Sequence, residues 1–186
     1  MADTQIWPYI EARNYRKVPA ETPRKVRLIV IHDMEFREHI SAAEDVAKYF
    51  ATTTTPASAH ICVDSDSIIQ CVYDRHVAYA APGANHDGIQ VELAGFGAQS
   101  KDQWLDRYGV CMLANAADAV AQYCLKYDIR ARQLTDEQLK DGVSGGIIGH
   151  YQASKVFKKS THTDPGPGFP WQFFIRSVQN FIDVRR

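Results

Sequence analysis

The chain has 186 residues, 45% of them hydrophobic, and a formal net charge of −1. This balance gives no electrostatic reason to expect nucleic acid or an anionic membrane as a partner, and no apolar run approaches the ~18–20 residues of a membrane span. The first residues lack the apolar core of a secretory signal, so we expect a protein made and kept in the cytoplasm. The four cysteines form no C-x-x-C pair, which argues against a thiolate zinc cluster and predicts free, mostly buried thiols.

Residues 1–25 are polar and interrupted by prolines. We expect them to form an N-terminal arm with a short helical turn, ahead of one domain over residues 26–186. That domain opens with VRLIVIH, a continuous apolar and β-branched run ending at His32. Such a run is typical of a strand that is buried on both faces.

A helix and a hairpin are predicted next. Residues 41–51 predict a helix with a capping box, in which Ser41 and Glu44 would satisfy each other's backbone N–H groups. The stretch ASAHICVDSDSIIQCVYD then alternates about a polar turn at residues 64–67, which predicts a β-hairpin.

The second half alternates between strand and helix patterns. Residues 88–95, GIQVELAG, predict a short strand, and residues 102–127 predict a long helix with one apolar face. Residues 135–139 begin a capped helix, VSGGIIGHYQA is a glycine-rich approach to His150, and residues 171–184 form an amphipathic terminal helix. This order indicates a single α/β domain with a central mixed sheet flanked by helices.

Three candidate metal ligands stand where these elements meet loops. His32 closes the first strand, His150 follows the glycine-rich IIG, and Asp164 begins the stiff loop DPGPG. Two imidazoles and one carboxylate leave a fourth position open for water, which is the arrangement of a catalytic zinc ion. A histidine at a strand end is more often a surface or hydrogen-bonded residue, so the spacing alone leaves both interpretations open.

Five segments in register strengthen the metal interpretation: VRLIVIHDM, SAHICVDSDSIIQCVYD, HDGIQVELAG, GGIIGHYQAS and HTDPGPGFPW. Together they resemble the type-2 N-acetylmuramoyl-L-alanine amidases. This family includes phage lysozymes with amidase activity, bacterial recycling amidases and the peptidoglycan recognition proteins. The resemblance extends from about Val26 to Phe174, and the local sequence is most similar to endolysins of phages that infect actinobacteria.

The resemblance implies a role for each matching residue. His32, His150 and Asp164 match the zinc ligands of the family, and Glu92 matches the glutamate that acts as general base in the recycling members. His162 stands where many members have a lysine that stabilises the oxyanion. A histidine there would make catalysis more sensitive to pH, because imidazole titrates near neutrality. Residues 162 and 164 lie two apart on an extended loop, so both side chains could face the metal.

The resemblance also implies substrate contacts, with two departures from the family pattern. His60 matches a histidine of relatives and is expected to line the cleft or to lie behind a ligand. Ala59 replaces the catalytic tyrosine of several phage relatives, which favours the route through Glu92. The chain lacks the histidine of a W-H-A motif found in relatives, and Asn85 and His86 are candidates to substitute for it.

The expected activity is zinc-dependent hydrolysis of the bond between N-acetylmuramic acid and L-alanine. We expect a phage or prophage endolysin that acts on the cell wall after release. A cytoplasmic amidase that recycles anhydro-muropeptides is the alternative within the enzyme class. A non-catalytic peptidoglycan-binding module is the alternative outside it, because fold alone does not separate enzyme from binder. We expect peptidoglycan or a muropeptide as partner, no nucleic acid or membrane, and a monomer.

Overall fold

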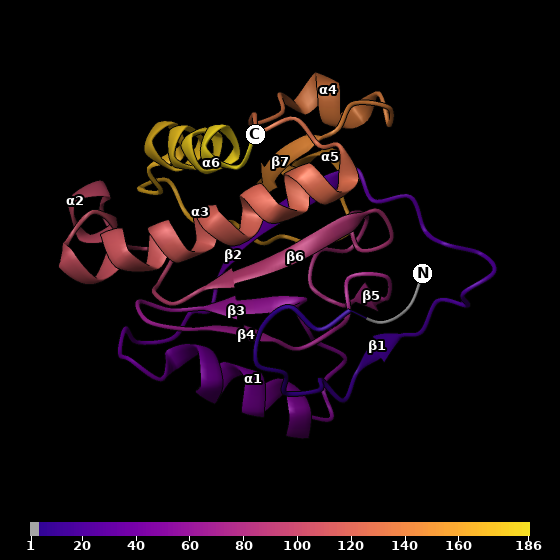
Figure 1. Ribbon diagram of the computed structural model, residues 1–186, viewed down its shortest axis with the longest axis horizontal. Helices are drawn as coiled ribbons and strands as arrows, with labels where there is room; N and C mark the ends of the chain where they lie inside the picture. Colours follow the sequence, from indigo (N-terminus) through magenta and orange to yellow (C-terminus); the bar gives the residue numbers. More distant parts are fainter. Residues whose placement is uncertain (1–3) are drawn as a thin grey trace.

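The computed structural model describes residues 4–186, and a central five-stranded sheet organises it in the order β4-β3-β6-β2-β7 (Figure 1). The strands β3, β6, β2 and β7 run parallel, and β4 pairs antiparallel with β3. The expected single α/β domain with a mixed sheet is therefore confirmed. The strands of this sheet are β2 (Leu28–Asp33), β3 (Ile61–Val63), β4 (Ile68–Gln70), β6 (Gly88–Leu93) and β7 (Gly146–Gly149).

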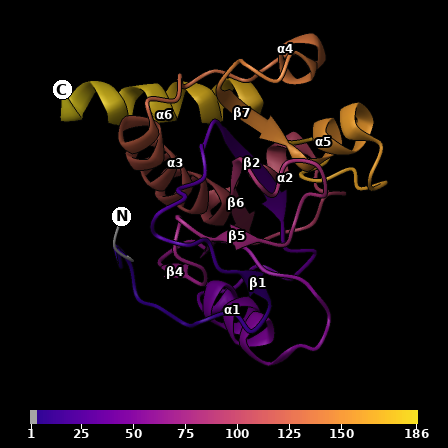
Figure 2. The same ribbon diagram turned by 90° about the vertical axis from the view of Figure 1, so that its right-hand side faces the viewer.

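Helices cover both faces of the sheet. The long helix α3 and the terminal helix α6 pack on one face, whereas α1 and α5 pack on the other (Figure 2). No helix in residues 4–186 is long and apolar enough to cross a membrane. The helices are α1 (Ala42–Thr52), α2 (Lys101–Trp104), α3 (Arg107–Tyr127), α4 (Asp136–Lys140), α5 (His150–Phe157) and α6 (Trp171–Arg185).

Side chains that alternate along β2 and β6 face opposite sides of the sheet, so core residues lie on one face and the polar residues at the strand ends lie on the other. Ile29 and Ile31 of β2, with Val91 of β6, belong to the core beneath α3 and α6. Because successive side chains in a strand point to opposite faces, the residues between them face the other side. His32 and Glu92 are register partners on adjacent parallel strands and so share that second face.

Two expectations about local structure were wrong. No helical turn forms in residues 4–25; the segment instead contains β1 (Tyr15–Arg16), which pairs antiparallel with β5 (Val77–Ala78). Residues 1–3 of the expected arm lie outside the described residues. The predicted capping box at Ser41 does not form, because the Ser41 side chain makes no capping hydrogen bond. The buried Asp64 of the hairpin turn accepts from the backbone N–H of Ala43 instead.

Two elements were missed or merged by the sequence patterns. The glycine-rich GIIG is strand β7, at the edge of the sheet. The long helix predicted over residues 102–127 is broken at residues 105–106, where Asp106 caps α3 by accepting from the N–H of Gly109. The hairpin turn is where it was expected, and the four cysteines are free, with Cys111 exposed and the others buried.

Candidate active site

The site forms where parallel strands end at the same edge of the sheet. His32 lies near the carboxyl end of β2, Glu92 near the carboxyl end of β6, and His150 immediately after β7 as the first residue of α5. β2 pairs in parallel with both β6 and β7. The three side chains therefore come together although the first and the last of them, His32 and His150, are more than a hundred residues apart in the sequence. The carboxyl edge of an open α/β sheet is where such folds place ligands.

A loop delivers the fourth member of the group. Asp164 follows α5, and its backbone carbonyl accepts from the N–H of Tyr151, which holds the loop against the start of α5. Further along the loop, Gly166 packs against Gly97 so closely that a methyl group on it would lie 1.8 Å from the Gly97 carbonyl oxygen. These two contacts fix Asp164 beside His150.

The donor atoms of His32, His150 and Asp164 all lie within 4.8 Å of one another. Nδ1 of His32 is 2.9 Å from Oδ2 of Asp164, and Nδ1 of His150 is 3.1 Å from Oδ1. The two histidines are only 2% and 1% exposed. The Asp164 Oδ1 atom is buried and forms no hydrogen bond of acceptable geometry. Two imidazole nitrogens and a carboxylate oxygen that point at one centre could all bind a small cation there, whereas Oδ1 of Asp164 forms no hydrogen bond with either ring.

Hydrogen bonds on the outer side hold His150 in place. Its Nε2 lies 3.2 Å from the hydroxyl of Ser160, which is itself 2.7 Å from the hydroxyl of Ser154. A metal-binding histidine commonly uses its second nitrogen in this way, and the contact leaves Nδ1 facing the centre. The sequence patterns had not singled out either serine, because isolated serines near a helix end carry no distinctive signal.

The electrostatics of the group show an excess of negative charge. Burial alone would lower the pKa of His32, but the carboxylates of Glu92 and Asp164 outweigh it and raise this pKa to about 9. Burial raises the pKa of Glu92 to about 8, and the nearby Asp164 and Asp33 add to the effect against the opposing His32. Burial alone would raise the pKa of Asp164, but the neighbouring imidazoles of His150 and His32 outweigh it and hold this pKa well below the usual range. A bound cation would relieve this repulsion.

Asp33 is an acidic neighbour that the sequence analysis did not select. It is buried, burial raises its pKa to about 7, and its Oδ2 atom has no hydrogen-bond partner. Its Oδ1 atom accepts from the N–H of Glu35, which fixes the turn after β2. The position directly after a strand-end histidine, in the letters HDM, was the available signal for it.

His162 stacks on His150. Its ring lies 4.3 Å from that of His150 at an interplanar angle of 16°, and its Nδ1 is 3.4 Å from Oδ1 of Asp164. The side chain is 64% exposed. His162 thus stands on the solvent side of the group, where an arriving substrate would meet it, and the i, i+2 spacing does bring residues 162 and 164 together.

A cleft of about 1130 Å³ opens over this group. The five residues His32, Glu92, His150, His162 and Asp164 contribute to one part of its wall. Another part comes from α1, through Tyr49 and Phe50, and from the loop at residues 55–58. The cleft therefore has room for a substrate much larger than a single amide bond, with aromatic surface beyond the polar group.

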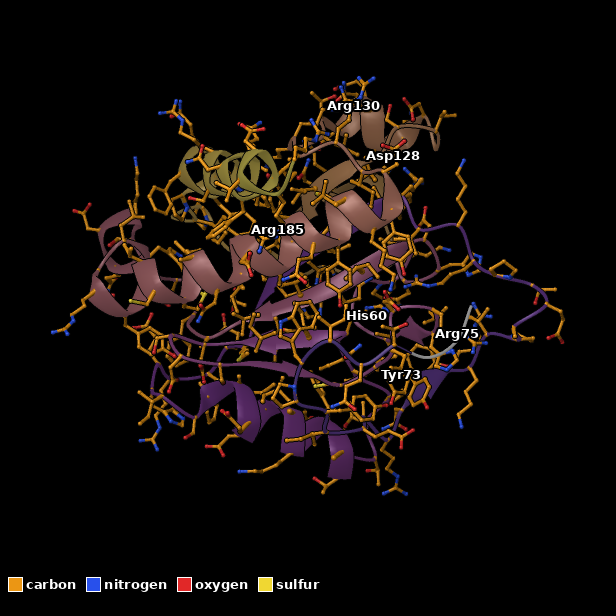
Figure 3. The ribbon with its side chains drawn as sticks, in the orientation of Figure 1. His60, Tyr73, Arg75, Asp128, Arg130 and Arg185 are labelled. Carbon is orange, nitrogen blue, oxygen red and sulfur yellow. The ribbon has the colours of Figure 1, made fainter. Side chains whose placement is uncertain are left out.

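The three residues proposed from the resemblance to contact substrate lie elsewhere. His60 is fully buried, directly before β3 and in the interior of the molecule (Figure 3). Asn85 accepts from the N–H groups of Ala80 and Ala81 and so fixes a local turn. His86 is exposed, with its Nδ1 2.9 Å from the Arg16 guanidinium. None of the three is among the residues that line the cleft, and each makes contacts with other parts of the protein.

Comparison with known proteins agrees with this arrangement. A family model described as N-acetylmuramoyl-L-alanine amidase matches residues 22–167. The chain belongs to this family. The expectation of an amidase enzyme is confirmed at that level, and the matched residues include every member of the polar group at the cleft.

Solved structures share the fold of this amidase. Hydrolase AmiA of Staphylococcus aureus, in complex with its ligand, is 17% identical, with 94% of this chain and 85% of that chain covered and a TM-score of 0.67. A derivative of AmpD is 18% identical over 96% of each chain, with a TM-score of 0.60. A mutant endolysin from Bacillus subtilis is 16% identical over 93% and 99%, with a TM-score of 0.57. No curated protein sequence matches the chain.

Proposed function

We propose that this amidase hydrolyses the bond between N-acetylmuramic acid and L-alanine in peptidoglycan, as a monomer, with zinc held by His32, His150 and Asp164. The observation that carries the proposal is the convergence of two buried Nδ1 atoms on an aspartate whose Oδ1 has no hydrogen bond. A structural zinc site would be expected to have four protein ligands, whereas three leave a position for water or substrate. The catalytic domain would comprise residues 26–186, with the preceding segment packed against it.

The residues around the ligands supply the remaining chemistry. A zinc ion bound there would polarise the scissile carbonyl and make water more acidic. Glu92 lines the cleft beside His32 and would take a proton from the attacking water. Its raised pKa would fall in the field of a cation, which favours the ionised form that a base requires. Glu92 would then pass the proton to the leaving amine.

His162 is the candidate for charge stabilisation. It lies beside His150 on the exposed side of the group, and a protonated imidazole there could donate to the oxyanion that develops on the attacked carbonyl. The same ring could instead give a proton to the leaving amine. Both roles need the protonated form, so both predict a loss of activity at alkaline pH.

The biological setting that we propose is a phage or prophage endolysin. The sequence HTDPGPGFPW and the segment before Glu92 support it, because both resemble endolysins of phages that infect actinobacteria. The solved structures of similar fold include both an endolysin and AmpD, so fold does not separate an endolysin from the alternative, a recycling amidase. The complete set of His32, His150, Asp164 and Glu92 argues against a non-catalytic binding module.

Digestion of purified cell-wall sacculi and of soluble anhydro-muropeptides, followed by mass spectrometry, tests the proposal. Release of stem peptides with a free L-alanine amine, and faster cleavage of sacculi, are the expected results. Glu92→Gln should bind zinc normally and lose about 10²–10⁴-fold in rate. Glu44→Gln, on α1 and outside the cleft, is the matched control. Cleavage at any other bond, or a Glu92→Gln rate within a few-fold of wild type, would contradict the proposal.

A further inference from the structure

A buried glutamine touches the first metal-site histidine. The Nε2 atom of His32 lies 2.9 Å from Oε1 of Gln90, on the side of the ring away from Asp164. Gln90 is fully buried on β6, two residues before Glu92 and on the same face of the strand. The contact therefore lies inside the protein, between the sheet and the ion site, where no solvent competes for it.

The orientation of the Gln90 amide is determined by its second contact. Its Nε2 lies 3.2 Å from the backbone carbonyl oxygen of Ala84. A carbonyl oxygen can only accept, so the NH₂ group must face Ala84 and the amide oxygen must face His32. An amide oxygen also only accepts, so the hydrogen of the neutral His32 ring is on Nε2. Nδ1, the atom that faces Asp164, is then left with a lone pair.

The buried histidine at position 60 fixes Gln90 in turn. Nδ1 of His60 accepts from the backbone N–H of Gln90 at 2.8 Å, and its Nε2 lies 3.2 Å from the carbonyl oxygen of His76. One nitrogen therefore accepts and the other donates, as a neutral ring requires. Burial and the neighbouring Arg24 guanidinium, 3.0 Å from Nε2, keep the pKa of His60 well below its usual value. His60 thus remains neutral and in one tautomer.

We propose that Gln90 is a positioning residue of the metal site, which holds His32 with Nδ1 free to bind the ion, and that His60 holds the Gln90 backbone in register. The inference rests on the zinc site proposed above. Of the two positions that the sequence left open for His60, in the cleft or behind a ligand, the inference assigns the second, as a support two steps behind the ion. It also accounts for a glutamine at a fully buried position of β6, where an amide without partners would be unfavourable.

Substitutions at Gln90 separate this role from ordinary burial. Gln90→Met keeps the length of the side chain but removes the acceptor, so His32 can change tautomer or rotate. Gln90→Glu keeps an acceptor for His32 and should rescue binding. Loss of a residue that orients a ligand commonly weakens metal affinity by about 10–100-fold. We expect that loss in Gln90→Met and a zinc affinity within a few-fold of wild type in Gln90→Glu.

Gln70 offers a matched control. It is also a fully buried glutamine on a strand of the same sheet. Within residues 4–186 its amide bonds only backbone groups, accepting from the N–H of Ile6 and donating to the carbonyl of Thr4. Gln70→Met should lower the melting temperature as Gln90→Met does, because both lose buried hydrogen bonds. Its zinc affinity should not change, because it touches no metal-site residue.

Chelator competition measures the zinc affinity of the four proteins, and nitrogen-15 histidine NMR of the wild type reports which His32 nitrogen carries hydrogen. The NMR measurement does not depend on whether a variant folds. Wild-type zinc affinity in folded Gln90→Met, or hydrogen on Nδ1 of His32 in the zinc-loaded wild type, would overturn the inference. Failure of the wild type to bind zinc would overturn the proposed metal site itself, and this inference with it.

Discussion

Replacing Gly166 with alanine should destabilise the protein and weaken zinc binding together. Gly166 has a φ of +86°, where an L-residue is strained by roughly 1–2 kcal/mol. The added methyl group would also lie 1.8 Å from the carbonyl oxygen of Gly97, a backbone atom that cannot rotate away. Overpacking of this kind costs about 1–3 kcal/mol. The two effects together predict a loss of about 2–5 kcal/mol in the free energy of unfolding.

Gly142 provides the control for this substitution. Its φ is +71°, but no atom of the described part of the chain lies within 4 Å of the position that a methyl group would take. Gly142→Ala should therefore lose only the conformational part, about 1–2 kcal/mol. The entropy that alanine removes from the unfolded chain is common to both variants and cancels in the comparison.

Denaturant unfolding of the zinc-free proteins measures the difference, followed by zinc titration of each variant. Gly166→Ala should be the less stable by about 1–3 kcal/mol. It should also bind zinc more weakly, because the strained loop carries Asp164 two residues earlier. Equal losses of stability in the two variants would refute the packing argument. Normal zinc affinity in a destabilised Gly166→Ala would refute the claim that this contact positions Asp164.

Four further predictions concern the site and its surroundings. His162→Lys should extend the alkaline limb of kcat/KM, because lysine keeps its charge to higher pH. His162→Ala should lower the rate by about 10²-fold. Superimposable pH–rate profiles of the three proteins, normalised to zinc content, would remove His162 from catalysis. Chelation should abolish hydrolysis and lower the melting temperature, because an ion that binds only the native state stabilises it; an unchanged melting temperature would contradict a bound ion. Burial lowers the pKa of His60, so below about pH 6.5 the unfolded chain binds one proton more than the folded chain. The free energy of unfolding should therefore fall there with decreasing pH, by at most about 1.4 kcal/mol per pH unit. His60→Asn should flatten this slope, and parallel stability–pH curves for the two proteins would argue against the role of His60. Asp33, Glu35 and Asp45 line the cleft, and none of its described lining residues is lysine or arginine. Because this negative charge repels carboxylates, stem peptides with amidated carboxylates should be cleaved faster than the free acids at low salt. Equal rates for the two substrates would count against this electrostatic selection.

The fold could be predicted wherever periodicity was long or strong. VRLIVIH reads as a buried strand because both of its faces are covered, Ile29 and Ile31 by α3 and α6 and the residues between them by the opposite layer. The strand GIIG was missed because four residues with two glycines carry no period. The break before α3 was hidden because apolar residues continue through it at helical spacing, and only the Asp106 cap marks it.

The site could be predicted in part, and the reason differs between its residues. His32, His150 and Asp164 stand at ends of strands or loops, where sequence neighbours predict their location. Contacts between distant segments are not visible in this way. The pairing of Gln90 with His60 depends on the register of β6 beside β3, and the seating of Asp164 depends on the approach of its loop to Gly97. Local resemblance therefore left His60 either in the cleft or behind a ligand, and the tertiary structure buries it beside Gln90.

The register of the sheet connects core packing to the proposed chemistry. Ile31 and Val91 are neighbours on β2 and β6, and both are held in the core beneath α3. The next pair along the same strands is His32 and Glu92. A slip of one residue would move Glu92 to the α3 face, because side chains alternate between faces. The apolar residues that bury against α3 thus determine which polar residues can reach the proposed metal site. A substitution that loosens this core should disturb the Glu92 geometry before it unfolds the chain.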